Sequence, residues 1–331
     1  MATPSTSTEE NRPRHTGLLR DENIFLRLLF GYADFGYADT CEDMPGPSFR
    51  SLATNLPKSS IKDVLLISID IDTFQGYEQI TSDQQFHTGV SLFDCRSLQA
   101  SGAALQADSE PDSVIKSLQF TIGDSRYCRR AANRFLFGQS EPILLSEVKP
   151  RLEQIVSGRD VVLVLHGAMC DFKVLEHLGI DLHPIFVIDT VKAAQHPLGL
   201  SYRYSLAKLL EALGISFAGL HAAGNDAHFA LRALLMIAVK DAERQTNTPF
   251  ITSLSKTLRS IALAPRPPSA GELAAPYIEA RQKENEERRK RRKANRQAKL
   301  QRRLERRNQA IDLAGPPNEM AKQGTESASA E

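Results

Sequence analysis

The sequence predicts an α/β domain in which a mixed five-stranded sheet is flanked by helices. Three strand-like stretches follow one another without a helix between them, which favours antiparallel pairing. Two further buried strands alternate with amphipathic helices, which favours parallel strands joined by right-handed crossovers. A long apolar segment after them is predicted as the helix that covers the sheet. The expected sheet is therefore antiparallel in its first part and parallel in its second.

The individual elements are assigned from the spacing of apolar residues and from breakers such as Gly and Pro. The stretch "DVLLISID" is a continuous apolar run, whereas "FHTGVSLFD" alternates between apolar and polar residues. The five predicted strands span residues 63–70, 86–94, 115–122, 161–167 and 184–190. The four predicted helices of the domain span residues 145–156, 171–179, 204–215 and 224–243.

The composition of the chain changes on either side of the domain, which is expected over residues 61–245. Residues 1–20 and 311–331 are polar and are predicted to be disordered tails. Residues 21–60 contain a short apolar run and the tandem "GYADFGYAD", and we expect this segment to pack on the domain. The stretch 246–278 is rich in Pro and Ser and is predicted to be a linker.

The charge of the chain is distributed unevenly. Residues 279–310 are predicted to form a basic, helical arm, and between 279 and 307 there are fourteen Lys and Arg against five Asp and Glu. Because the whole chain has a formal net charge of +1, the remainder carries −8. An acidic body with a basic arm indicates one segment suited to cations and another suited to anions.

The bulk properties favour a protein of a reducing intracellular compartment. The four cysteines are widely spaced and form no Cys-x-x-Cys pair, which argues against a disulfide scaffold. Neither a secretory signal nor a run of about 18 apolar residues is evident, so no membrane contact is expected. The expected location is the nucleus, the cytoplasm or both.

Two acidic residues stand at the end of the first predicted strand. Asp70 and Asp72 are two residues apart, and strand alternation places them on one face of the sheet. Asp72 could simply end the strand. Asp70, however, belongs to the apolar run, where an unpaired carboxylate is costly to bury. A buried Asp usually has a cation beside it, which favours a functional interpretation.

Two further acids stand at predicted helix starts. Asp171 follows the fourth strand, and Asp226 lies in "HAAGND", five residues after His221. Asp in the first turn of a helix offsets the helix dipole, so each of these positions has a purely structural explanation. All four acids nevertheless fall at points that a mixed sheet could bring together.

Four clustered carboxylates predict a site for hard divalent cations. They cannot all remain ionised without compensating positive charge. Oxygen ligands suit Mg²⁺ or Mn²⁺ rather than Zn²⁺, and two such ions about 3.5–4 Å apart promote phosphodiester hydrolysis. A histidine beside them can accept a proton from the attacking water, and His221 fits this role.

These motifs resemble a known family. The sequence Asp70-Ile71-Asp72, then "HGAMCD" with Asp171, then "HAAGND" with His221 and Asp226, resembles the RNase H-like DEDD-type 3′–5′ exonucleases of the DEDDh subgroup. The stretches "VIDTVKAA" and "YSLAKLLEALGI" are similar to intervening elements of that family. More narrowly, "FLFGQSEPI" and "HAAGNDAHFALRALL" resemble the fungal Gfd-type branch, named for "great for full DEAD-box activity".

The resemblance, which covers residues 60–243, implies an RNase H-like fold and a metal-dependent exonuclease. Asp70, Asp72, Asp171 and Asp226 would bind two Mg²⁺ or Mn²⁺ ions, and His221 would be the general base. The substrate would be the 3′ end of RNA or single-stranded DNA. The first motif usually ends in Glu, so the shorter Asp72 puts the rate in doubt more than the fold.

Two other features point to nucleic acid. Phe74 lies where a terminal base could stack, although a core Phe is an equally good interpretation. A run of six bases in the arm predicts either nuclear import or contact with nucleic acid, against the alternative of a solvated charged helix. The six residues are Arg288, Arg289, Lys290, Arg291, Arg292 and Lys293.

Three functions remain open at this stage. The leading one is an exonuclease that acts on RNA rather than DNA and has ribonucleoprotein or helicase partners. The second is an RNase H-fold module that binds nucleic acid without cutting it. The third is an adaptor that acts through "GYADFGYAD".

Overall fold

The computed structural model describes residues 17–32, 64–73, 75, 84–100, 114–167, 169–201, 203–245 and 248–313. The chain divides into two compact units, one ending at Ser269 and the other beginning at Ala270. The described part of the first unit is called the body below. Its helices are α1 (Asp21–Phe30), α3 (Arg96–Ala100), α4 (Arg126–Arg134), α5 (Leu145–Val156), α6 (Met169–His177), α7 (Thr190–Ala193), α8 (Gln195–Leu198), α9 (Leu206–Leu213), α10 (Ala223–Ala242) and α11 (Pro249–Ala262).

The body is built on a six-stranded mixed sheet. Its strands are β1 (Val64–Thr73), β2 (Phe86–Asp94), β3 (Ile115–Ile122), β4 (Ser140–Ile143), β5 (Asp160–Leu165) and β6 (Phe186–Asp189). Their order is β4-β3-β2-β1-β5-β6. The β1–β2 and β2–β3 pairs are antiparallel, and the β1–β5, β5–β6 and β3–β4 pairs are parallel.

The predicted mixed sheet with flanking helices is confirmed. The predicted number of five strands is wrong, because β4 was missed. The sequence of β4 is Ser-Glu-Pro-Ile, and only Ile143 is buried. A short polar strand that contains Pro is tolerated at a sheet edge, and in sequence it cannot be told from a loop. The short helix α3 follows β2 directly, and residues 101–113, between α3 and β3, lie outside the described residues.

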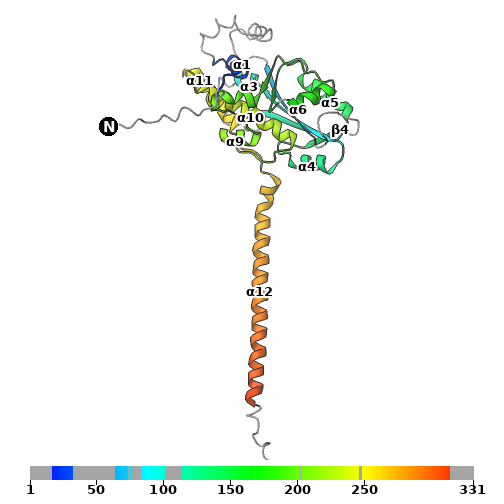
Figure 1. Cartoon of the computed structure of the whole chain (residues 1–331), viewed down its shortest axis with the longest axis vertical. Coiled ribbons are helices and arrows are strands. Elements are labelled where there is room, and N and C mark those ends of the chain that lie inside the picture. Colours follow the sequence, from blue (N-terminus) through cyan, green and yellow to red (C-terminus); the bar gives the residue numbers. More distant parts are fainter. Residues whose placement is uncertain are drawn as a thin grey trace, which may run out of the picture. The chain divides into compact units, whose positions relative to one another are not determined.

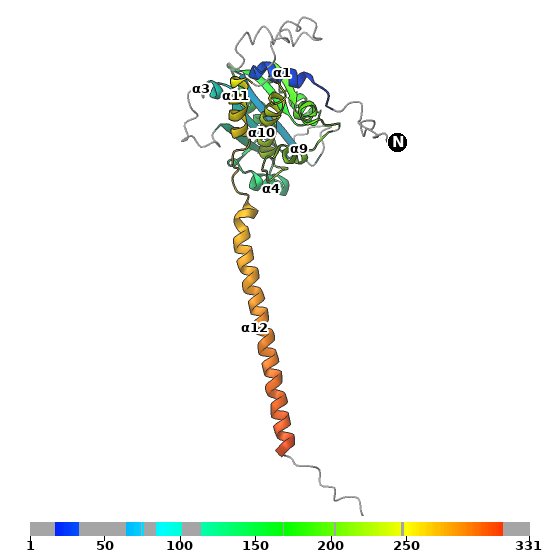
Figure 2. The ribbon, with the colours of Figure 1, turned by 90° about the vertical axis from the view of Figure 1, so that its left-hand side faces the viewer.

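Helices cover both faces of the sheet (Figure 1). On one face α10 lies against β1, β2 and β3, and α1, α9 and α11 pack around it; all of them contribute to one apolar cluster. On the other face α5 and α6 bury a second apolar cluster against the strands. Figure 2 shows α1, α9, α10 and α11 together in front of the strands. The acidic residues of β1 therefore lie in a sheet whose two faces are both covered by helices.

The faces of β1 follow from its alternation. Val64 and Leu66 belong to the cluster on the α10 side, and Ile67, Ile69 and Ile71 belong to the cluster on the α5 and α6 side. Asp70 and Asp72 keep the parity of Leu66, so their side chains face the α10 side.

The structure differs from the predicted linker over residues 246–278. Residues 249–262 form α11, which begins at the capping residue Thr248. Its buried side chains recur every three or four residues and join the cluster around α10: they are Ile251, Leu254, Leu258 and Ile261. The folded body therefore continues beyond residue 245, where the domain was expected to end.

We expect Leu258→Ala to destabilise the body by about 2–5 kcal/mol, because it removes a buried side chain from a packed core. Leu258 is 1% exposed, whereas Leu263 is 42% exposed. Leu263→Ala is thus the matched control, with an expected change of about 0.5 kcal/mol or less. Urea unfolding measures both. Equal, small losses would mean that α11 is a linker after all.

The two ends of the described chain also differ from the predicted tails. Within the expected tail 1–20, the N–H of Gly17 donates to the carbonyl of Leu200 at 3.1 Å, and the Arg20 side chain donates to Gln195 at 3.0 Å. The following helix α1 buries Phe25 and Leu29 in the cluster around α10. Most of "GYADFGYAD" lies outside the described residues.

The second unit contains α12 (Ala270–Leu313), a 44-residue helix that is called the arm below. Residues 311–313, which were expected to belong to the disordered C-terminal tail, form the end of this helix. Exposed i,i+4 ion pairs form along it, between Glu284 and Arg288 at 3.4 Å and between Glu286 and Lys290 at 2.8 Å. No helix in the described ranges combines the length and the apolar character needed to cross a membrane.

Candidate active site

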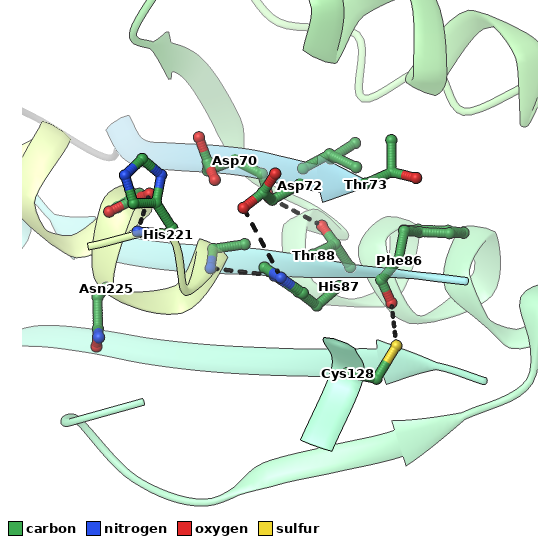
Figure 3. Close-up of polar contacts among 12 residues, drawn as sticks. Asp70, Asp72, Thr73, Phe86, His87, Thr88, Cys128, His221 and Asn225 are labelled. Carbon is green, nitrogen blue, oxygen red and sulfur yellow. Dashed lines mark hydrogen bonds and ion pairs between the residues drawn. The ribbon is translucent and has the colours of Figure 1, made fainter. Parts of the chain in front are cut away.

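The first part of the site is the end of β1, which is longer than its parallel neighbour. The β1–β5 ladder ends at the pair Ser68 and Val164, and β1 continues to Thr73. Asp70 and Asp72 stand on this extension, opposite Gly89 and His87 of β2. Figure 3 shows both carboxylates along β1, together with His221.

Asp171 closes the side of β1 that β5 leaves uncovered. It lies in the first turn of α6, and its Oδ1 accepts the backbone N–H of Ile71 at 2.9 Å. Asp171 is 6% exposed. A buried N–H needs an acceptor, and Asp171 supplies it where the β-ladder has ended. This bond holds the third acid beside the first two.

The second part of the site is the start of α10, which is held by side chains of the sheet. Its N-cap residue is Ala222, which provides no side-chain cap. Instead, the N–H of Ala223 donates to Nδ1 of His87 at 3.2 Å, and the N–H of Gly224 donates to Oε1 of Gln119 at 3.0 Å. Two of the free N–H groups of the helix are thereby satisfied from β2 and β3.

The start of α10 also lies unusually close to the sheet. A Cβ on Gly89 would lie 2.0 Å from the carbonyl atoms of Ala223, and a Cβ on Gly224 would lie 2.5 Å from the ring of Phe135. Ala222 and Ala223 are fully buried. Close packing of the start of α10 on β2 therefore requires the small residues of "HAAGND".

We expect Gly89→Ala to destabilise the body by about 3 kcal/mol or more, because its Cβ would overlap the backbone of α10. Gly214→Ala is the control: Gly214 has φ +69° but open space around it, so only the left-handed backbone opposes a side chain, at about 1–2 kcal/mol. Thermal unfolding compares the two. A Gly89→Ala protein as stable as the Gly214→Ala protein would contradict this close approach.

His221 and Asp226 form the corner that leads into α10. His221 is exposed and has φ +65°, so the chain turns sharply there. Its N–H donates to Oδ2 of Asp226 at 3.0 Å. The other oxygen of Asp226, Oδ1, is buried and has no hydrogen-bond partner among the described residues. One oxygen of Asp226 therefore holds the turn at His221, while the other has no partner among the described residues.

A further clamp holds this corner, and it was not predicted. Asn225 is fully buried; its amide donates to the carbonyls of Arg134 and Gly219, each at 2.8 Å, and its Oδ1 accepts the N–H of Leu136 at 2.9 Å. The loop after α4 and the loop before His221 are thereby fixed to α10. In sequence, Asn225 looks like an ordinary residue of a helix start.

Comparison with known families identifies this arrangement. Residues 65–237, just over half of the chain, match the family model of the DEDDh type described as DNA polymerase III subunit epsilon-like, C-terminal domain. The chain belongs to the DEDDh family. No curated protein sequence matches the chain at a significant level. The body is thus an exonuclease-like domain with an RNase H-like fold, of a family that generally uses divalent metal ions and acts on nucleic acid.

The carboxylates of this DEDDh domain repel one another. Burial and then the charges of Asp226, Asp171 and Asp72 raise the pKa of Asp70 well above its usual value. Burial raises the pKa of Asp171 to about 7, against the bond from Ile71, and raises that of Asp226 to about 7, against the bond from His221. Compensating positive charge would lower all three.

Divalent cations fit the donor set of the DEDDh site. All four acids offer hard oxygen ligands, and the buried Oδ1 of Asp226 lacks a protein partner. Within the described ranges, no three acidic, His or Cys side chains already stand at the spacing of a closed metal cluster. The carboxylates nevertheless lie near enough for Asp226, Asp171 and Asp72 all to act on Asp70. The acids are gathered, and their side chains would have to close around an ion.

The predicted site residues have different positions in the structure. Asp70, Asp72, Asp171, Asp226 and His221 come from β1, α6 and the start of α10 and surround one end of β1. Phe74 lies outside the described residues. The six bases from Arg288 to Lys293 are exposed on the arm, in the second unit.

Proposed function

We propose that the protein is a metal-dependent 3′–5′ exonuclease that hydrolyses phosphodiester bonds of RNA or single-stranded DNA. The observation that carries this proposal is the meeting of four acids from β1, α6 and α10, one of which has a buried oxygen without a protein partner. A structural role explains one oxygen of Asp171 and one of Asp226. It does not explain why the buried Asp171 and the half-buried Asp70 and Asp226 are kept together at the cost of mutual repulsion.

Asp70, Asp72, Asp171 and Asp226 would hold two Mg²⁺ or Mn²⁺ ions, which supply activation of water and stabilisation of the leaving oxygen. The chain itself performs the remaining tasks. Ile71 and Asp171 fix the end of β1, and Asn225 fixes the corner of α10. His221 is exposed beside this corner, where its imidazole can accept the proton of the attacking water.

Incubation of the purified full chain with single strands tests the proposal. RNA and DNA oligonucleotides labelled at the 5′ end are expected to give ladders that shorten from the 3′ end, with Mg²⁺ or Mn²⁺ but not with chelator. RNA is the preferred substrate in this proposal. Strands blocked at the 3′ end by phosphate are expected to resist. The absence of any ladder with either metal at low salt would reject the enzyme.

A non-cutting nucleic-acid module is the second candidate. Its support is Asp72, one methylene shorter than the usual Glu, together with side chains that do not form a closed cluster in the described residues. For this candidate, Asp171→Ala would leave the cellular role intact, whereas deletion of 279–310 would abolish it. For the enzyme, Asp171→Ala would abolish the role.

The arm is proposed to increase affinity for nucleic acid or to direct import into the nucleus, with action in the nucleus, the cytoplasm or both. Its six consecutive bases are exposed on a solvated helix. A place in the Gfd-type branch, and with it helicase or ribonucleoprotein partners, belongs to the same proposal. This part of the proposal is supported by the sequence resemblance of "FLFGQSEPI" and "HAAGNDAHFALRALL" to that branch.

Deletion of residues 279–310 is expected to weaken binding of single-stranded RNA and to flatten its dependence on salt. Each lost phosphate contact reduces the slope of log K against log [salt] by about 0.7. Fluorescence anisotropy at salt concentrations from about 50 to about 200 mM measures this slope. Replacing the six bases from Arg288 to Lys293 by Gln preserves the length of the arm and should reproduce much of the loss. An unchanged slope in both variants would exclude the arm as a binding element.

A further inference from the structure

His87 connects the two halves of the acidic site. It is fully buried on β2, where the strand register places it directly opposite Asp72. Its Nε2 lies 3.9 Å from Oδ2 of Asp72, and its Nδ1 accepts the N–H of Ala223 at 3.2 Å. Tyr127 stacks on the ring, with centroids 5.0 Å apart. One imidazole thus lies between the first acid motif and the start of α10 (Figure 3).

The bond from Ala223 fixes the tautomer of His87. A ring nitrogen that accepts an N–H bond carries no proton, so the neutral ring must carry its proton on Nε2. This N–H is directed toward Asp72. Nε2 is buried and has no hydrogen-bond partner among the described residues, because 3.9 Å is longer than a hydrogen bond. A small movement of the Asp72 carboxylate would complete the bond.

We infer that His87 is a positioning residue of the proposed nuclease, which orients the Asp72 carboxylate through Nε2–H while Nδ1 anchors the start of α10. The inference rests on the proposed function. Carboxylates that bind metals are commonly oriented by an outer hydrogen-bond donor, and loss of such a donor costs about 10–100-fold in metal affinity or activity. Asp72 is 28% exposed and stands where the family usually has Glu, so a short carboxylate has particular need of a donor.

A purely structural role for His87 as a cap of α10 predicts a different pattern of variants. In His87→Asn, the amide oxygen can replace Nδ1 and still accept the N–H of Ala223, but no donor reaches Asp72. In His87→Gln, the longer amide can donate to Asp72, while the acceptor for Ala223 is displaced. The two variants therefore separate the cap from the donor.

The experiment is a titration of the full chain with Mn²⁺, by calorimetry without nucleic acid and by nuclease rate with it. We expect His87→Asn to bind Mn²⁺ about tenfold more weakly and to need correspondingly more Mn²⁺ for half-maximal rate, with the rate restored at saturation. His87→Gln is expected to stay within about threefold of wild type, as a variant that keeps the donor. His228→Asn is the control, because this buried His is bonded to Ser117 at 2.8 Å rather than facing an acid.

A second readout does not depend on activity. The ¹⁵N NMR signals of the His87 ring in the metal-free protein are expected to show the Nε2–H tautomer. A proton on Nδ1, or a His87→Asn protein that binds Mn²⁺ as wild type does, would overturn the inference while leaving the nuclease in place. A wild-type protein that neither binds Mn²⁺ nor cuts would instead reject the proposed function, and the role of His87 with it.

Discussion

Asp70→Asn is expected to lower the rate of cleavage by about a thousandfold or more and, in the metal-free protein, to stabilise the fold. The loss follows because a carboxylate at the centre of the site would no longer contribute several kcal/mol of charge stabilisation, and each 1.36 kcal/mol is a factor of ten. The gain follows because Asn has the same shape without the charge. Burial and three neighbouring acids oppose that charge, which is why the pKa of Asp70 is raised.

The gain in stability has a definite dependence on pH. Asp70, and Asp171 and Asp226 with pKa values of about 7, bind protons in the folded state at pH values where the unfolded chain, with Asp near 3.9, has released them. The protonated carboxyls therefore stabilise the folded state fully below about pH 4, and this stabilisation is lost as the pH rises through about 7. His87, His166 and His228 act in the opposite direction, because burial lowers their pKa.

The difference in Tm between Asp70→Asn and wild type isolates the acids from these histidines. We expect it to be small at pH 4 and to reach several degrees at pH 8, since 1 kcal/mol shifts Tm by about 2–4 °C in a domain of this size. Mg²⁺ should raise the Tm of wild type at pH 8 and that of the variant much less. Asp160→Asn, on an exposed residue, is the control. A variant less stable than wild type at pH 8 without metal would contradict the electrostatic account.

His221→Asn is expected to reduce kcat by about 10²–10⁴-fold and to leave KM and Mn²⁺ affinity nearly unchanged. General base catalysis is worth this range, and it is the role proposed for the exposed imidazole of His221. Asn is preferred to Ala as the replacement because residue 221 has φ +65°, a conformation that Asn tolerates. The fall in rate should therefore come from the lost proton acceptor and not from a strained corner.

His183→Asn provides a closely matched control. His183 is also exposed, also has a positive φ, of 46°, and also lies beside an acid, with Nδ1 3.1 Å from Asp181. Steady-state kinetics of both variants at saturating metal measure the effect. Loss of rate in both proteins, or an intact kcat with a raised KM in His221→Asn, would remove His221 from the role of base.

The sequence was sufficient to predict the parts of the fold that depend on local pattern. The strands β1, β2 and β3 were visible because their apolar residues either run together or alternate, and α10 was visible because it is long and apolar. The edge strand β4 was not, since its pairing with β3 depends on neighbours and its residues are polar. In α11, spacing by three and four at Ile251, Leu254 and Leu258 was present but was outweighed by the surrounding Ser, Thr and Pro.

The gathering of the four acids at one end of β1 could be predicted, and the residues that support them could not. Asp70 and Asp72 were conspicuous because charge inside an apolar strand is costly. His87, Gln119 and Gly89 acquire meaning only through strand register, which places His87 opposite Asp72 and brings the backbone of α10 against Gly89. Polar residues on one face of β2 were a signal, but the sequence does not state the register that gives them partners.

The central claim is that the end of β1 binds divalent metal between β1, α6 and α10. Crystals of the full chain soaked in Mn²⁺ test it directly through anomalous scattering. We expect two peaks within ligand distance of Asp70, Asp72, Asp171 and Asp226, one of them bound by Oδ1 of Asp226. A map without peaks at this site, from crystals in which Asp70 and Asp171 are well ordered, would contradict it.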